Sequence, residues 1–284
     1  MLGRDERESS AHALLAARAQ GWSAEPVELL DLGTIADTLA TVASLDGLAA
    51  VVHLGHPEQP SPGLERALLE GAPSLTLTAA VAVLPEWVWV AGPGSSGGQV
   101  VVDEAGLRDC AGILRGLGIH PRLVPTRTPI AERIALAGPD GSLVVERSRM
   151  PAGFAELPDS AVLAERGPVW YGLLQSRADA PEFTTPAQVW LAFGPYDDHR
   201  GSLQPTLSVI ADAGIDLQHL RSQASVTGPH VFFTSFSCPS SAVLAALVNE
   251  LDTSGIAHRV LAVLPGAAFE PGPDRATPQW SGEL

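Results

Sequence analysis

The sequence contains no lysine, because all 17 of its basic residues are arginines. Without a lysine the chain cannot form the Schiff base of a pyridoxal-phosphate enzyme or supply the lysine of a P-loop. Its 32 Asp and Glu residues give a formal net charge of −15. Such a charge opposes the approach of nucleic acids and anionic membranes. We therefore expect neither as a partner.

Cysteines and metal-ligand patterns are also scarce. Cys110 and Cys238 lie far apart and form no CxxC motif, which predicts two buried free thiols in a reducing compartment. His53 and His56 have an HxxH spacing, but no third ligand type is near them in sequence. We therefore expect no metal ion, and the sequence indicates no other cofactor.

No apolar run is long enough for a membrane span. The most apolar stretch, residues 75–91, is interrupted by Pro85 and Glu86. The charged first ten residues contain no signal-peptide pattern. These features predict a cytoplasmic protein that does not enter membranes.

Apolar runs alternate with helical periods over the first two thirds of the chain. Residues 48–54 form a continuous apolar run typical of a strand buried on both faces, after a predicted helix at 34–44. Two more strands are predicted at 75–83 and 87–90. The glycine-rich segment 92–98 then predicts the boundary between two lobes.

Beyond that segment the pattern is βαβαβ, which favours a parallel sheet with helices on its faces. The predicted strands and helices occupy residues 99–102, 104–116, 122–124, 129–136 and 143–146. A late strand at 169–174 returns to the first lobe. Two such lobes leave a cleft between them that suits a small ligand.

After a polar linker at 176–186 the pattern becomes βαββαβ, which predicts a ferredoxin-like module. Its strands are predicted at 188–193, 217–226, 230–237 and 258–263, and its helices at 203–213 and from Ser240 or Ser241 to Gly255. The Gly- and Pro-rich end of the chain, residues 265–284, predicts a flexible tail.

Three segments of this module resemble an ACT domain of the kind attached to prephenate dehydratases. Residues 201–207 stand where the family has GALxxxL, residues 220–224 are similar to IESRP, and residues 230–236 are similar to YLFFIDF. The resemblance implies an amino-acid effector bound at Gly201, Leu203, Leu220 and Ser222. Gln223 replaces the arginine of IESRP, so the effector site is either altered or empty. The resemblance also implies a homodimer or homotetramer.

The first 178 residues resemble the dehydratase domain of the same family in the order and spacing of its motifs. Leu2-Gly3 and Ser9 keep the frame of LGPEGTFS, and Leu107 and Cys110 keep that of SHPQALxxC. VVPIENS, STA and TRF fall on residues 51–57, 127–129 and 169–171.

The implied fold class is α/β, with a two-lobed, type II periplasmic-binding-protein-like dehydratase domain followed by a ferredoxin-like βαββαβ ACT domain. The expected boundaries are 1–178 for the dehydratase-like domain (lobe 1 at 1–92 and 165–178, lobe 2 at 93–164), 187–264 for the ACT domain and 265–284 for the tail.

The motif positions that carry polar contacts in the family are mostly replaced. The threonine of TRF, the asparagine of ENS and the glutamine of SHPQAL correspond here to Val169, His56 and Ala105. Valine cannot donate a proton and alanine cannot orient a substrate, so ordinary dehydratase activity is expected to be weak or absent. His56 is either a candidate acid, since imidazole titrates near neutrality, or a histidine of a surface loop.

Arg7, Arg127 and Thr128 are the candidate substrate-binding residues. Guanidinium groups pair with carboxylates bidentately, and prephenate carries two carboxylates. The alternative is that each arginine is solvated and balances an acidic surface.

Together these observations predict a divergent prephenate dehydratase-like protein of aromatic amino-acid metabolism. It is expected to bind prephenate or a related cyclohexadienyl dicarboxylate in the cleft and, if active, to be a carbon–oxygen or carbon–carbon lyase. Two alternatives remain open: a non-aromatising prephenate decarboxylase, and a catalytically silent ACT-containing sensor or regulator of amino acids.

Overall fold

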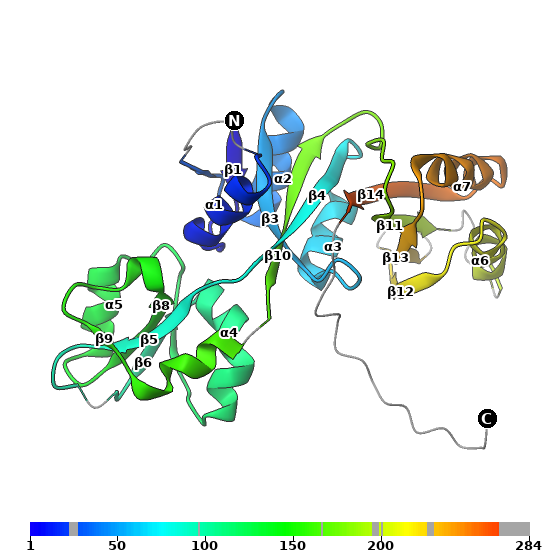
Figure 1. Ribbon diagram of the computed structural model, residues 1–284. Coiled ribbons are helices and arrows are strands. Elements are labelled where there is room, and N and C mark those ends of the chain that lie inside the picture. Colours follow the sequence, from blue (N-terminus) through cyan, green and yellow to red (C-terminus); the bar gives the residue numbers. More distant parts are fainter. Residues whose placement is uncertain are drawn as a thin grey trace, which may run out of the picture.

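Two β-sheets organise the chain in the computed structural model (Figure 1). The structure describes residues 1–22, 28–95, 97–165, 167–194, 199, 201–225 and 230–266. The larger sheet has nine strands in the order β12-β13-β11-β14-β4-β10-β3-β1-β2, and the smaller has five in the order β7-β6-β8-β5-β9. Among the described helices, none combines the length and the apolar composition that crossing a membrane requires.

One half of the larger sheet is built from the first part of the chain and from one late strand. Its strands are β1 (Leu2–Arg4), β2 (Leu30–Asp31), β3 (Ala49–Gly55), β4 (Leu75–Val83) and β10 (Val169–Ser176). β1 pairs in parallel with β2 and β3, and β10 runs antiparallel between β3 and β4. The returning strand predicted at 169–174 is confirmed, and β1, for which no strand was predicted, is short and paired on both sides.

Three helices cover this half of the sheet. They are α1 (Ser10–Ala19), α2 (Ile35–Ser44) and α3 (Pro62–Glu70), and only α2 was predicted. Successive side chains of β3 point to opposite faces, so Ala50 and Val52 pack under α2 and α3 while Val51 packs under α1.

The smaller sheet is the predicted βαβαβ unit with two strands added. Its strands are β5 (Trp87–Ala91), β6 (Val100–Asp103), β7 (Arg122–Val124), β8 (Ser142–Glu146) and β9 (Ala155–Glu156). α4 (Glu104–Gly116) and α5 (Ile130–Ala137) connect the parallel strands, and the 3-10 segments η1 (Arg147–Arg149) and η2 (Pro158–Glu165) follow β8 and β9. α4 and α5 lie on opposite faces of the sheet.

The lobe boundary predicted at 92–93 is wrong. β5 pairs antiparallel with β8, from Trp87 opposite Glu146 to Ala91 opposite Ser142, so it belongs to the smaller sheet. The chain changes sheets at residues 84–86, where Pro85 has no N–H for a strand ladder. The glycine-rich segment is therefore a connection inside the smaller lobe.

The last third of the described chain has the predicted split βαβ topology. Its elements are β11 (Ala187–Gly194), α6 (Leu203–Asp212), β12 (Leu217–Gln223), β13 (Val231–Cys238), α7 (Ser241–Thr253) and β14 (Ala257–Pro265). The Ser240 side chain caps α7 by accepting the N–H of Val243. The turn expected at 227–229, between the strands predicted at 217–226 and 230–237, and residues 267–284 of the predicted tail lie outside the described residues.

The polar linker suggested that the ferredoxin-like module is separate from the first lobe, but the two parts are joined. β14 lies parallel to β4, with Ala262 opposite Leu77, so the two parts share the nine-stranded sheet. Trp190 and Phe233 of the module belong to the same buried cluster as Leu68 of α3. We call this contact region the joint.

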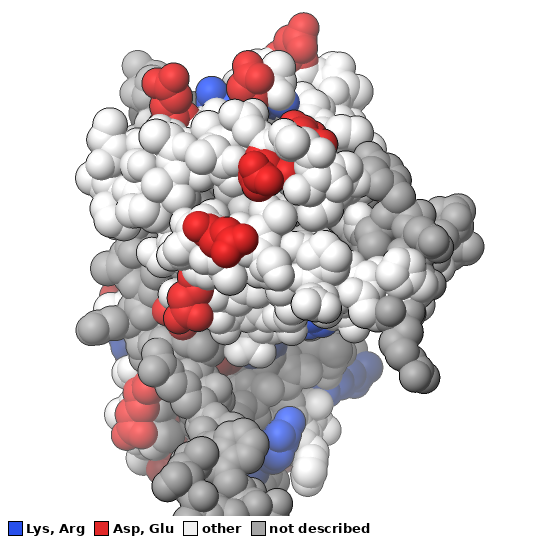
Figure 2. All heavy atoms as spheres, turned by 90° about the vertical axis from the view of Figure 1, so that its right-hand side faces the viewer, with Lys and Arg blue, Asp and Glu red and all other residues white. Residues whose placement is uncertain are grey.

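The surface agrees with the acidic composition. Figure 2 shows the side of the molecule that lies to the right in Figure 1, and Asp and Glu predominate among the charged side chains visible there.

Candidate functional site

A cavity of about 380 Å³ lies where the loop after β1 passes between the two lobes. Its lining residues are Asp5, Arg7, Glu8, Ile35, His53, Ser61, Gly63, Leu64, Glu104 and Arg108. They come from the carboxyl ends of β1 and β3, the first turns of α2 and α3, and the start of α4. Ligands of open α/β sheets bind at such carboxyl ends. We call this space the cleft cavity.

Several hydrogen bonds join the loop after β1 to the smaller lobe. Arg108 Nη1 donates to both carboxylate oxygens of Glu8, at 2.7 and 2.8 Å. Ser9 Oγ donates to Glu146 Oε1 at 2.5 Å, and Thr126 Oγ1 donates to the carbonyl oxygen of Arg7 at 2.9 Å. The wall of the cleft cavity formed by this loop is therefore held from both lobes.

Asp5 is the carboxyl group of the cavity whose titration is most perturbed. The residue is only 6% exposed, and its Oδ1 accepts the backbone N–H of Arg7 at 2.8 Å. The pKa of Asp5 is raised to about 6, chiefly by burial; the charges of Glu8 and Glu6 contribute to the rise, while the N–H bond and the charge of Arg7 oppose it. Asp5 can therefore exchange a proton close to neutral pH, as a general acid must.

Glu8 is shared between Arg108 and a buried tyrosine. Tyr171 Oη donates to Glu8 Oε2 at 3.5 Å, a long bond, and burial raises the pKa of Tyr171 well above its usual value. The phenol therefore stays protonated. The ring of His53 stands edge-on to that of Tyr171, with the centroids 5.9 Å apart.

The histidine that lines the cavity is His53, whereas the sequence suggested His56. Gly55, with φ +79°, turns the chain after β3, and His56 packs its ring edge-on against Trp170 at 6.0 Å. The loop that follows is fastened to the ferredoxin-like module, because Trp190 Nε1 donates to the Pro57 carbonyl oxygen at 2.7 Å. His56 is absent from the cavity lining, so its assignment as the acid is not supported by this geometry.

Arg7 and Arg127 come together at a smaller cavity of about 140 Å³, which Glu104 also lines. Arg7 lines both cavities, and no carboxylate of the described residues lies within 4.0 Å of its guanidinium group. The Arg127 side chain is 72% exposed and pairs with Glu6 at 3.2 Å.

Thr128 is buried and lines neither cavity; its carbonyl oxygen accepts a bond from Arg133 Nε at 2.8 Å. Arg133 also pairs with Asp103 at 2.7 Å and donates to the Thr126 carbonyl oxygen at 2.6 Å. Thr128 is thus part of a loop that Arg133 holds in place.

Two of the replaced motif positions lie in hydrophobic cores. Val169 packs with Tyr171 and Val83, and Ala105 packs with Cys110 in the smaller lobe. Neither residue lines the cleft cavity. The polar groups of the cavity therefore come from other positions.

Sequence reasoning missed Asp5, Glu8, His53, Glu104 and Arg108 as residues of the cavity. The sequence contained a signal for them. Each of these residues lies near the carboxyl end of a predicted or observed strand, or in the first turns of the helix that follows a strand. Polar residues at such strand ends are candidates for ligand contact.

The four expected effector residues occupy two places in the ferredoxin-like module. Gly201, with φ +93°, and Leu203 lie at the start of α6. Leu220, 41% exposed, and the exposed Ser222 lie on β12, the outermost strand of the larger sheet. The described residues contain no group of three or more side chains able to hold a metal ion.

Comparison with known proteins gives matches among solved structures only. No protein-family profile matches the sequence, and no curated protein matches it. A prephenate dehydratase from Staphylococcus aureus subsp. aureus Mu50 is similar at 13% identity and a TM-score of 0.62, over 93% of this chain and 100% of that one.

A prephenate dehydratase from Arthrobacter aurescens, solved in complex with L-Phe, is similar at 17% identity and a TM-score of 0.68, over 98% of this chain and 93% of the other. GqqA, described as a novel type of quorum quenching acylases, is similar at 17% identity and a TM-score of 0.59, over 96% and 100%. Two prephenate dehydratases thus match along nearly their whole length, and this chain has the prephenate dehydratase-like fold.

Proposed function

We propose that this chain is a divergent prephenate dehydratase-like lyase of aromatic amino-acid metabolism. It binds a small cyclic carboxylic acid, prephenate or a cyclohexadienyl relative, in the cleft cavity. The observation that carries the proposal is the cavity itself, which brings a guanidinium group (Arg7), a proton-exchanging carboxyl group (Asp5) and an imidazole (His53) into one space. The likeness in fold to two prephenate dehydratases supports it.

The proposed roles follow from the chemistry of these groups. Arg7 binds a carboxylate of the ligand, and protonated Asp5 supplies the proton. In dehydration, the bond from the ring to its carboxylate breaks, the electron pair enters the ring, and the ring hydroxyl leaves as water with the Asp5 proton. In decarboxylation alone, the same electron pair takes the Asp5 proton at a ring carbon and the hydroxyl stays.

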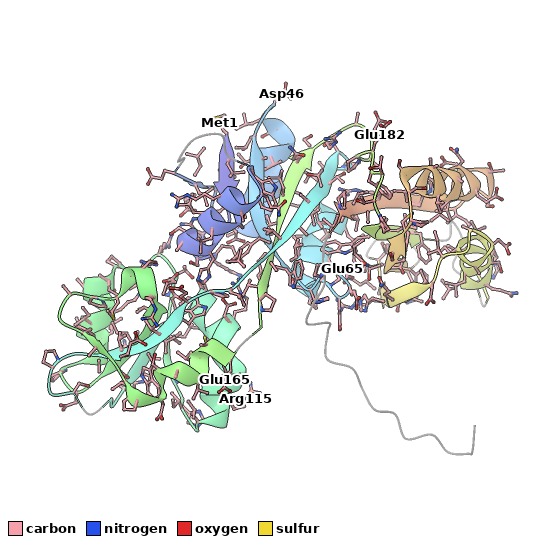
Figure 3. All side chains as sticks on the ribbon, viewed as in Figure 1. Met1, Asp46, Glu65, Arg115, Glu165 and Glu182 are labelled. Atoms are coloured by element: carbon pink, nitrogen blue, oxygen red, sulfur yellow. The ribbon has the colours of Figure 1, made fainter. Side chains whose placement is uncertain are left out.

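Incubation of the purified protein with prephenate tests the proposal. Phenylpyruvate absorbance reports dehydration, and a non-aromatic product that has lost carbon dioxide, identified by mass, reports decarboxylation. Asp5→Asn and Arg7→Gln should each lower either activity by at least about 100-fold, a typical effect of removing an acid or an oriented charge. Arg115→Gln, at the exposed end of α4, is the matched control (Figure 3). Absence of both products would refute the lyase proposal.

A second candidate is a catalytically silent sensor of amino acids, favoured by the joint. The module that resembles an ACT domain bonds to α3, and the first turn of α3 lines the cleft cavity. In this proposal a homodimer or homotetramer binds an amino acid near Gly201, Leu203, Leu220 and Ser222. Calorimetric binding of L-phenylalanine that Leu220→Asp abolishes, without turnover of prephenate, would support it.

A further inference from the structure

Two short crossings connect the lobes covalently. The chain passes from β4 to β5 through residues 84–86, and it returns between the end of η2 and the start of β10. Among the described helices and strands, none of the smaller lobe packs broadly against one of the larger lobe. Since crossings of this kind can act as hinges, the position of one lobe relative to the other depends on local contacts between them.

The loop after β1 supplies such contacts from four consecutive residues, 6–9. The Glu6 carboxylate accepts a bond from Arg127 at 3.2 Å, and the Glu8 carboxylate accepts two from Arg108 at 2.7 and 2.8 Å. The other two residues also bond to the smaller lobe, at 2.9 and 2.5 Å. Their partners lie on α4, after β7 and at the end of β8. The loop therefore contacts three separate parts of the smaller lobe.

The same loop is fixed to the larger lobe. Arg4 Nη1, at the end of β1, donates to the carbonyl oxygens of Asp5 and Glu8, both at 2.9 Å. The Glu6 N–H donates to the Gly33 carbonyl oxygen at 2.7 Å. The loop is therefore held to the body of the larger lobe, and its bonds to the smaller lobe fix the two lobes relative to each other.

Of the two ion pairs in this loop, the one between Glu8 and Arg108 is better shielded from water. The Glu8 side chain is 9% exposed and the Arg108 side chain 30%. The corresponding values for Glu6 and Arg127 are 27% and 72%. Asp109 Oδ1 also accepts a bond from Arg108 Nε, at 3.0 Å, and so orients the guanidinium group. A shielded and oriented ion pair contributes more than an exposed one.

We infer that residues 6–9 form a latch that holds the two lobes together before any ligand binds, and that the Glu8–Arg108 pair contributes most of its strength. Arg7 and Glu8 of the latch line the cleft cavity, so the latch keeps that cavity assembled. A ligand then does not have to close the lobes with its own binding energy, as it does in hinged proteins that are open when empty. Such a latch acts whichever ligand the cavity takes, so it stands apart from the proposed function.

Spin-label distance measurements on the full chain test the latch. The labels are attached through Asp46→Cys on the larger lobe and Arg115→Cys on the smaller lobe, two exposed positions labelled in Figure 3; both native cysteines are buried. We expect one narrow distance distribution for this parent protein without ligand. Arg108→Gln and Glu8→Gln should each raise the ratio of separated to closed molecules at least about 10-fold, because charge-assisted hydrogen bonds are lost.

The double variant tests whether the two residues act on each other. If Glu8 and Arg108 form the latch pair, replacing both should change the ratio no more than replacing either one. Thr126→Val removes the bond to the Arg7 carbonyl oxygen without removing a charge, and it tests the same latch if Arg108→Gln does not fold. It should raise the ratio about 3-fold, in the same direction.

The matched control is Arg66→Gln, which breaks an exposed ion pair with Glu70 inside the larger lobe and should leave the distribution unchanged. Thermal melting shows whether each variant is folded. A broad distribution in the parent protein, an unchanged one in folded Arg108→Gln or Thr126→Val, or additive effects of the two charge substitutions would overturn the inference. Longer distances in both single variants, with no further change in the double variant, would support it.

Discussion

Two buried carboxyl groups in this protein have opposite surroundings. Glu65, at the joint (Figure 3), is fully buried, and each of its oxygens accepts a side-chain hydrogen bond: Arg221 Nη1 donates at 2.7 Å and Gln223 Nε2 at 2.6 Å. Asp5, in the cleft cavity, receives a single backbone N–H and has Glu6 and Glu8 beside it. Both oxygens of Glu65 are therefore bonded to side chains of the protein, whereas the Asp5 carboxyl group is bonded to one backbone N–H.

The difference separates a structural role from a functional one. Burial raises the pKa of both groups, but at the joint Arg221 and Gln223 oppose that rise from across the interface. A fully bonded buried carboxylate holds two elements together. An incompletely bonded one is retained at a cost in stability, which is typical of functional sites.

The largest expected effect is the loss of the Glu65 carboxylate. Glu65→Ala should lower the free energy of unfolding by about 3 kcal/mol, because it leaves Arg221 and Gln223 at the joint without their acceptor. Urea denaturation measures it. The control is Glu70→Ala on the same helix, whose pair with Arg66 is exposed and should cost at most about 0.5 kcal/mol. Equal effects of the two variants would contradict the comparison.

Asp5→Asn should stabilise the protein, in a pH-dependent way. The folded-state pKa of about 6 lies above the usual 3.8, so the native state loses stability as the pH rises from about 4 to 6 and Asp5 ionises. Asparagine removes that loss. The variant should gain about 2 to 3 kcal/mol at pH 8 and nothing at pH 4.

Urea denaturation at both pH values measures this gain. Asp37→Asn is a contrast of opposite sign, since Thr34 lowers the pKa of the exposed Asp37 and its contribution is lost on acidification. A destabilised Asp5→Asn at pH 8 would mean that Asp5 is a structural carboxylate like Glu65.

Arg259→Lys, at the joint, should lower the free energy of unfolding by less than Glu65→Ala does. The Arg259 guanidinium group donates to the carbonyl oxygens of Leu68, Gly71, Ala72 and Leu75, where α3 ends. Lysine keeps the charge but cannot reach the same set of acceptors, so the expected cost is about 1 to 2 kcal/mol. Thermal unfolding measures it, with the exposed Arg115→Lys as the control. An unchanged melting temperature would show that the joint does not depend on these bonds.

The smallest effect is expected for Arg127→Gln. Its pair with Glu6 is exposed and screened by solvent, so the free energy of unfolding should change by less than about 0.5 kcal/mol. Urea denaturation at low and high salt measures it. A decrease in the free energy of unfolding of more than about 1 kcal/mol would show that the Arg127–Glu6 pair stabilises the fold as a buried pair does.

Local structure was predictable wherever one segment contained its own signals. α4 begins at Glu104 and ends at Gly116 as predicted, because the Asp103 side chain caps its first turn and the apolar stripe sets its length. The strand β4, 75–83, was also predicted, since its apolar run and Pro85 define it. The lobe boundary was predicted wrongly, because a glycine-rich segment indicates a loop but does not show to which sheet the strand before it belongs.

The candidate site was less predictable than the fold. Arg7 was identified, whereas His53 was passed over for His56 because spacing along the chain does not show which way a strand-end residue points. The raised pKa of Asp5 comes chiefly from its burial in the loop after β1, a loop whose Glu8 is bonded to Arg108, a hundred residues later in the chain.

The amino-acid sequence by itself determined the α/β composition, the βαβαβ and βαββαβ orders, and the excess of acidic groups, because periodicity, caps and charge are local properties. Only the tertiary structure decided that the last module extends the first lobe's sheet, that Glu65 finds both its partners there, and that Asp5 is buried at a cavity with a backbone N–H bonded to its carboxyl group. The reason is that pairing and desolvation depend on which distant surfaces meet, and no single segment specifies that.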